Sequence, residues 1–265
     1  MTNSEAWYNL KMGEVEILER CDENLLRKIF ETPCTTPKCM LYLESGCKPI
    51  RFLIMTRRLL FLHYILNEDA QSLISQFFEA QNSQPLKDDW SAQVFEDLQV
   101  LEIHLTLEKN KNSSREQFKK LIDQLIHKAA FKYLLENQKK SSKVLHIRYE
   151  ELKMQTYLQS KLVNQYSAKF IFNLRSRMLD VAKNYPNKTK SKICPVCKDP
   201  NSEDTQGHIL NCPSLFTNEL IQENDVKKQL LVSKIIETKF KTRKKILRNS
   251  SQPEEPSKPL GCSTL

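Results

Sequence analysis

Three cysteines and one histidine lie within nineteen positions near the C-terminal end of the chain, at the spacing of a metal site. Cys194 and Cys197 are separated by two residues, and His208 and Cys212 by three. Two thiolates on a tight C-x2-C turn can share one metal ion, and a His and a Cys four positions apart can project from one helical turn. The ten residues between the pairs are rich in turn-forming types, so they can fold back. The spacing therefore predicts a zinc site.

The predicted ligand set also indicates what the metal does. Cys194, Cys197, His208 and Cys212 would complete the tetrahedral shell that Zn2+ prefers, which leaves no position for a reacting water. We therefore expect a structural zinc ion. The alternative is a group of reduced thiols beside an unrelated surface histidine, and the paired spacing argues against it.

Scarce glycine determines the expected fold class. The chain of 265 residues holds only four glycines, so neither of the common glycine-rich phosphate-binding loops can be assembled. Abundant Leu, Lys, Glu, Gln and Asn favour helices. We expect a mainly α protein, in which a multi-helix region is followed by a small CCHC zinc knuckle, a C-terminal helix and a disordered tail.

Charge and composition divide the chain into five segments. Residues 1–104 hold 10 Lys and Arg against 16 Asp and Glu, a net charge of −6, and form an acidic helical region. Residues 105–193 hold 20 against 7, a net charge of +13, and form a basic helical region. The zinc knuckle follows at 194–215, the C-terminal helix at 216–248 and the disordered tail at 249–265. A basic block next to the knuckle suits a polyanionic partner, although a solvated lysine-rich surface is the alternative.

Two of the predicted helices carry histidine or arginine residues that could serve either packing or binding. The helix predicted from Pro49 to Leu66 is apolar on nearly every face, so it should be central and His63 should be a core residue. Arg51, Arg57 and Arg58 on the same helix could contact phosphate or pair with acidic neighbours. A second amphipathic helix is expected over 165–183, with Arg175 and Arg177 directed away from its apolar face.

The cysteine pattern and the hydropathy favour a reducing compartment. The eight cysteines have no regular disulfide spacing, no signal sequence follows Met1, and no run of eighteen apolar residues occurs. We expect an intracellular protein, nuclear or cytoplasmic, without a membrane partner. Cys262 begins a C-terminal tetrapeptide that fits the prenylation pattern formally, but its middle residues are not aliphatic.

Several stretches, taken in order, resemble the C-terminal part of non-LTR (LINE-like) retrotransposon reverse transcriptases, downstream of the polymerase core. The stretches are Ser4–Tyr8 (SEAWY), Tyr42–Arg51 (YLESGCKPIR) with Arg57-Arg58, Phe172–Asp180 (FNLRSRMLD) and Cys194–Cys212. The similarity spans most of residues 1–248. It implies a helical linker followed by a CCHC zinc knuckle that grips element RNA or target DNA. Carried over residue by residue, it gives the same four zinc ligands.

The departures from that family remove its catalytic functions. The chain has no Tyr/Phe-x-Asp-Asp polymerase motif and no recognisable endonuclease signature, and only 53 residues follow Cys212. We therefore expect a truncated fragment that is not an enzyme. The polymerase region of a related element is a further candidate partner.

Two functions follow from these features. The first is a non-catalytic, zinc-dependent fragment that binds RNA or single-stranded DNA mainly through phosphates. Its candidate contacts, with Tyr185 either stacking on bases or belonging to the local core, are Lys188, Lys190, Lys192, Lys198, Arg175, Arg177 and Tyr185. The second is a structural or protein-interaction fragment in which zinc only staples helices together, without nucleic-acid binding.

Overall fold

The computed structural model describes residues 12–84, 86, 89–102, 114–161, 163–179, 181–184, 191–215, 237–239 and 241–248. Within these ranges the regular structure is helical, and extended backbone pairs only in an isolated antiparallel bridge between Ile193 and Glu203. The mainly α fold class predicted from the sequence is confirmed. The tail predicted to be disordered, 249–265, lies outside the described residues. None of the described helices is long and apolar enough to cross a lipid bilayer.

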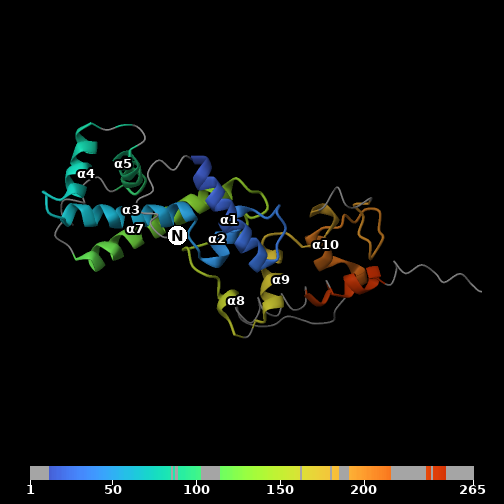
Figure 1. Cartoon of the computed structure of the whole chain (residues 1–265). Coiled ribbons are helices and arrows are strands. Elements are labelled where there is room, and N and C mark those ends of the chain that lie inside the picture. The colour runs from blue at the N-terminus through green and yellow to red at the C-terminus, as the bar shows by residue number, and fades with distance from the viewer. Residues whose placement is uncertain are drawn as a thin grey trace, which may run out of the picture. The chain divides into compact units, whose positions relative to one another are not determined.

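The chain forms two compact units, Met1–Val163 and Asn164–Leu265. The helices of the first unit are α1 (Met12–Phe30), α2 (Lys38–Ser45), α3 (Ile50–Asn67), α4 (Leu73–Ser83), α5 (Trp90–Val100), α7 (Arg115–Lys139) and α8 (Thr156–Gln159) (Figure 1). The second unit contains α9 (Gln165–Arg175), the short 3-10 turns η2 (Ala182–Asn184) and η3 (Pro213–Leu215), and α10 (Gln206–Asn211). Residues 237–239 and 241–248 are also helical, which agrees with the later part of the predicted C-terminal helix.

The boundary between the units differs from the segments drawn by charge. Those segments end at residues 104 and 193, whereas the units meet at 163/164. The reason is that apolar faces, not net charge, decide which helices pack together. Helix α7 comes from the basic segment but packs on α2 and α3 from the acidic one (Figure 1).

Helix α3 is the centre of the first unit, as its apolar sequence predicts. It contacts α1, α4, α5 and α7. Phe52, Leu59 and Leu62 are almost fully buried, and each such side chain contributes about 1.5–3 kcal/mol of hydrophobic stabilisation. The prediction that His63 is a core residue is confirmed, because its ring stacks on Phe118 with the centroids 4.3 Å apart.

Two arginines of α3 pair with acidic side chains. Arg51 makes a bidentate contact with Glu19, with Nη2 2.7 Å from Oε2. Arg58 donates to both carboxylate oxygens of Asp97 at 2.8 and 3.0 Å. Of the two roles left open by the sequence, these residues therefore take the structural one. Both pairs lie within the acidic segment 1–104, where they tie α3 to α1 and to α5.

The Tyr42–Arg51 stretch, one of those that carry the family resemblance, fixes the packing of α2. The Tyr42 hydroxyl donates to Asp22 at 3.0 Å, and burial together with that carboxylate raises the pKa of the phenol, so it stays a donor. The buried Glu44 carboxylate accepts from the hydroxyls of Tyr149 and Tyr157. These contacts tie α2 to α1, to the chain before α8 and to α8 itself.

Gly46 ends α2 in a conformation that other residues avoid. Its φ is +71°, and its N–H donates to the Tyr42 carbonyl at 2.8 Å. A Cβ built at this position would lie 2.2 Å from the Met154 backbone nitrogen. Only glycine satisfies both the left-handed turn and the close approach of the 153–155 backbone.

Candidate metal centre

The four predicted ligands meet at one point in the second unit. One ligand atom each from Cys194, Cys197, His208 and Cys212 lies within 4.8 Å of every other. The Cys194 and Cys212 sulfurs are 4.0 Å apart, and the Cys197 sulfur is 3.4 Å from Nε2 of His208. In a tetrahedron with metal–ligand bonds of 2.0–2.3 Å, ligand atoms are separated by about 3.3–3.8 Å. The arrangement is therefore close enough to hold a metal ion.

A tight turn presents the first two cysteines. The Lys198 N–H donates to the Cys194 carbonyl at 3.0 Å, and Lys198 has a φ of +54°. The Cys194 N–H donates in turn to the Ser202 carbonyl at 2.8 Å, which closes the loop behind the turn. The backbone N–H groups of Val196 and Cys197 point at the Cys194 sulfur, and that of Asp199 points at the Cys197 sulfur. Such donors stabilise thiolate charge.

Helix α10 presents the other two ligands. Thr205 is its N-cap and accepts from the His208 N–H at 3.0 Å. Cys212 is the C-cap residue, one turn beyond His208. Residues four apart lie on the same face of a helix, so His208 and Cys212 both reach the turn that carries Cys194.

The two cysteines of the turn have different environments. Burial raises the pKa of Cys194 to about 11. The Asp199 N–H lowers the pKa of the more exposed Cys197 below its ordinary value. A metal must displace the thiol proton of each cysteine when it binds, so metal affinity falls as the pH falls.

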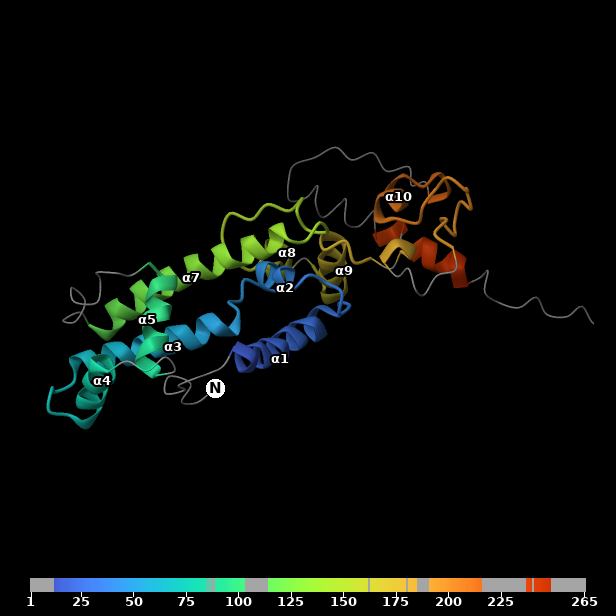
Figure 2. The same cartoon turned by 90° about the horizontal axis from the view of Figure 1, so that it is seen from above.

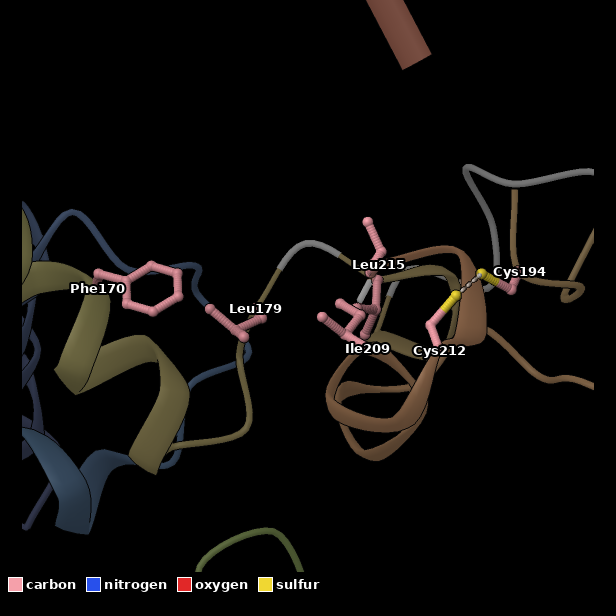
Figure 3. Packing of buried hydrophobic residues seen from close by; sticks show 7 residues of the cluster. Phe170, Leu179, Cys194, Ile209, Cys212 and Leu215 are labelled. Atoms are coloured by element: carbon pink, nitrogen blue, oxygen red, sulfur yellow. Dashed lines mark hydrogen bonds between the residues drawn. The ribbon is translucent and has the colours of Figure 1, made fainter. Parts of the chain in front are cut away.

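Two of the four candidate metal ligands belong to the hydrophobic core of the second unit. Cys194 and Cys212, each 1% exposed, pack with Ile209 and Leu215. The same cluster continues to residues of and after α9, namely Phe170, Leu179 and Val181 (Figure 3). The knuckle predicted at 194–215 therefore shares its core with residues that the charge-based segments assigned to the preceding region.

A buried ion pair lies next to the candidate metal centre, and the sequence did not predict it. The Asp204 carboxylate, 1% exposed, accepts from the Ala182 N–H at 2.7 Å and from Arg243 Nη2 at 2.5 Å. Asp204 directly precedes the Thr205 cap of the helix that holds His208. It thus joins three parts of the second unit: the loop that carries Cys194 and Cys197 (residues 192–205, the metal loop), η2 and segment 241–248. The Asp-Thr pair before the histidine was a visible signal, but nothing in the sequence distinguishes Arg243 from its basic neighbours.

The residues predicted to contact nucleic acid differ in their exposure, and three of them lie outside the described residues. Lys192 and Lys198 are exposed on the metal loop. Arg177 is exposed but does not lie on a helix as expected: α9 ends at Arg175, where the Ser176 hydroxyl bonds back to the Phe172 carbonyl and Arg177 takes a φ of +55°. Arg175 is half-buried in the last turn of α9 and has polar or ring contacts. Tyr185, Lys188 and Lys190 lie outside the described residues.

No protein-family model matches the chain, and comparisons with curated proteins and with solved structures gave no match either.

Proposed function

We propose that this chain is a non-catalytic, zinc-dependent module that binds RNA or single-stranded DNA mainly through phosphates. The observation that carries the proposal is the Cys3His cluster with exposed lysines on its own loop. Three sulfurs and one imidazole nitrogen are the donors that Zn2+ prefers in structural sites, and four protein ligands leave no position for a reacting water. The module would therefore use zinc to hold a shape.

Phosphate recognition would come from the loop around the metal. Lys198 follows the second cysteine and Lys192 lies two positions before the first, so both positions depend on the folded loop. Lysine binds phosphate as a point charge, which gives affinity with little sequence information. The expected ligand is a flexible strand whose phosphates can adapt to the loop.

The resemblance to the C-terminal region of LINE-like reverse transcriptases remains part of this proposal. The resemblance implies that the knuckle of those proteins, downstream of the polymerase core, also binds RNA or DNA. The Tyr42–Arg51 residues of the resemblance serve packing in the first unit, so they add no nucleic-acid contact to the proposed surface.

One observation favours a second function. Because the candidate ligands Cys194 and Cys212 share a core with Phe170 and Leu179, zinc could serve only to staple the second unit together. This alternative requires zinc for folding but predicts no affinity for nucleic acid. The two functions therefore differ in one measurable property.

Reversing the loop charges tests the proposal. We expect Lys192→Glu with Lys198→Glu to weaken binding of the zinc-loaded chain to a fluorescein-labelled 20-nucleotide RNA or single-stranded DNA about tenfold at 100 mM KCl. The slope of log K against log salt should fall by about 1.4, since each single-strand phosphate contact contributes about 0.7. Fluorescence anisotropy over a KCl series measures both quantities.

The matched control is Arg20→Glu with Lys28→Glu, two exposed side chains of α1 in the first unit that give the same change in net charge. It should leave affinity within about twofold, because neither side chain belongs to the metal loop whose lysines are proposed to contact phosphate. A zinc-loaded wild-type chain that binds neither strand at 50 mM KCl would reject the proposal and leave the staple function.

A further inference from the structure

Segment 241–248 has one buried cation among several exposed ones. Arg243 is 5% exposed, and its guanidinium meets the Asp204 carboxylate of the metal loop. Removing either partner would leave an uncompensated buried charge, so the pair holds the segment against the loop. Figure 2 shows this segment, in red, beside α10.

The opposite face of the segment is a row of cations. All four members are exposed, and their positions i, i+3, i+4 and i+7 place them on one side of a helix: Lys241, Lys244, Lys245 and Arg248. Arg243 lies on the other side, about 200° around the axis from Lys241. No Asp or Glu occurs from Thr238 to Arg248, and the row's first member, Lys241, pairs with Glu237 just before that stretch.

Contacts at the start of the segment hold it in the second unit. Glu237 accepts from the Ser167 hydroxyl of α9 at 3.3 Å. Lys241 pairs with Glu237 at 2.7 Å, and its ammonium lies 5.2 Å from the centre of the Tyr166 ring. The segment is thus anchored to both α9 and the metal loop, which fixes the direction in which its cationic row faces.

We propose that the exposed face of segment 241–248 is a second phosphate-binding surface for single-stranded nucleic acid, positioned by the Asp204–Arg243 pair. The inference deepens the proposed function and rests on it. The row spans about 10 Å along the helix axis, enough to contact more than one phosphate of a strand. Cations near the C-terminal end of a helix can also serve only to compensate the helix dipole. That role alone would not require the row to be anchored to the metal loop.

Arg243 is a positioning residue in this scheme. A metal held by His208 and Cys212 would fix α10, Asp204 lies immediately before the α10 cap, and Asp204 holds Arg243. Loss of Arg243 should therefore weaken binding more than loss of a single exposed cation, although both changes remove one positive charge.

The experiment compares variants of the zinc-loaded full chain by anisotropy with the same labelled 20-nucleotide RNA and single-stranded DNA. Lys244→Glu with Lys245→Glu should weaken binding about tenfold at 100 mM KCl and lower the salt slope by about 1.4. Arg243→Met should weaken binding about tenfold, whereas its matched control Arg248→Met should do so only about twofold to threefold. Each variant is first checked for one zinc per chain.

Three results would overturn the inference. If Lys244→Glu with Lys245→Glu keeps wild-type affinity and salt slope while Lys192→Glu with Lys198→Glu loses them, the second surface does not exist, but the proposed function stands. Equal effects of Arg243→Met and Arg248→Met would remove the positioning role. A wild-type chain that binds neither strand would reject the proposed function and the inference together.

Discussion

Stripping zinc from the loaded chain with a chelator should unfold the metal loop, α9 and segment 241–248 while the first unit stays folded. Metal binding to structural sites supplies about 10–16 kcal/mol of apparent free energy at neutral pH, which matches or exceeds the stability of about 5–15 kcal/mol that is typical of a folded protein. The buried sulfurs of Cys194 and Cys212 lie in the same core as Phe170 and Leu179. Hydrogen exchange followed by mass spectrometry should show lost protection in α9, in residues 191–215 and in segment 241–248, and little change in α3 and α7.

A cysteine variant separates metal loss from other effects of the chelator. Cys212→Ser should reproduce the loss of protection, because it removes a buried ligand. Cys34→Ser is the matched control, since this thiol is exposed and lies in the first unit. Protection in α9 that survives both chelation and Cys212→Ser would show that the second unit folds without its metal.

Replacing Gly46 by alanine should lower the free energy of unfolding of the first unit by about 3 kcal/mol or more. The new Cβ would lie 2.2 Å from the Met154 nitrogen and 2.6 Å from the Lys153 carbonyl carbon. Both are backbone atoms, so the backbone of residues 153–155 must move. The positive φ adds its own strain for any residue with a side chain. Urea denaturation followed by far-ultraviolet circular dichroism measures the loss.

Gly13→Ala is the control for this change. No atom lies within 4 Å of a Cβ at Gly13, and α1 is helical there. Alanine should therefore stabilise the unit slightly, by less than about 1 kcal/mol. The account of α2 would be wrong if Gly46→Ala and Gly13→Ala unfolded at the same urea concentration.

The parts of the structure that sequence predicted best depend on local pattern. The ligands at 194, 197, 208 and 212 come together because a C-x2-C turn and a helical i, i+4 pair are fixed by neighbouring residues. The apolar sequence of α3 likewise predicts its central place and the packing of His63, since a helix without a polar face must be surrounded.

The parts that sequence could not predict depend on distant partners. Asp204 and Arg243 are 39 positions apart, and Arg243 sits in a run of lysines where helical position alone decides which cation is buried. The choice of Asp97 as the partner of Arg58 is also set by packing, because α5 lies against α3. Helix α9 ends early for a local reason, the Ser176 back-bond and the left-handed Arg177, which amphipathic spacing does not reveal.

The central claim is that Cys194, Cys197, His208 and Cys212 hold one structural zinc ion. X-ray absorption at the zinc edge, on the purified chain with its metal content measured, tests it directly. We expect one zinc per chain with three sulfurs at about 2.3 Å and one nitrogen at about 2.0 Å. Substoichiometric zinc, or a shell of oxygen and nitrogen without sulfur, would contradict the claim.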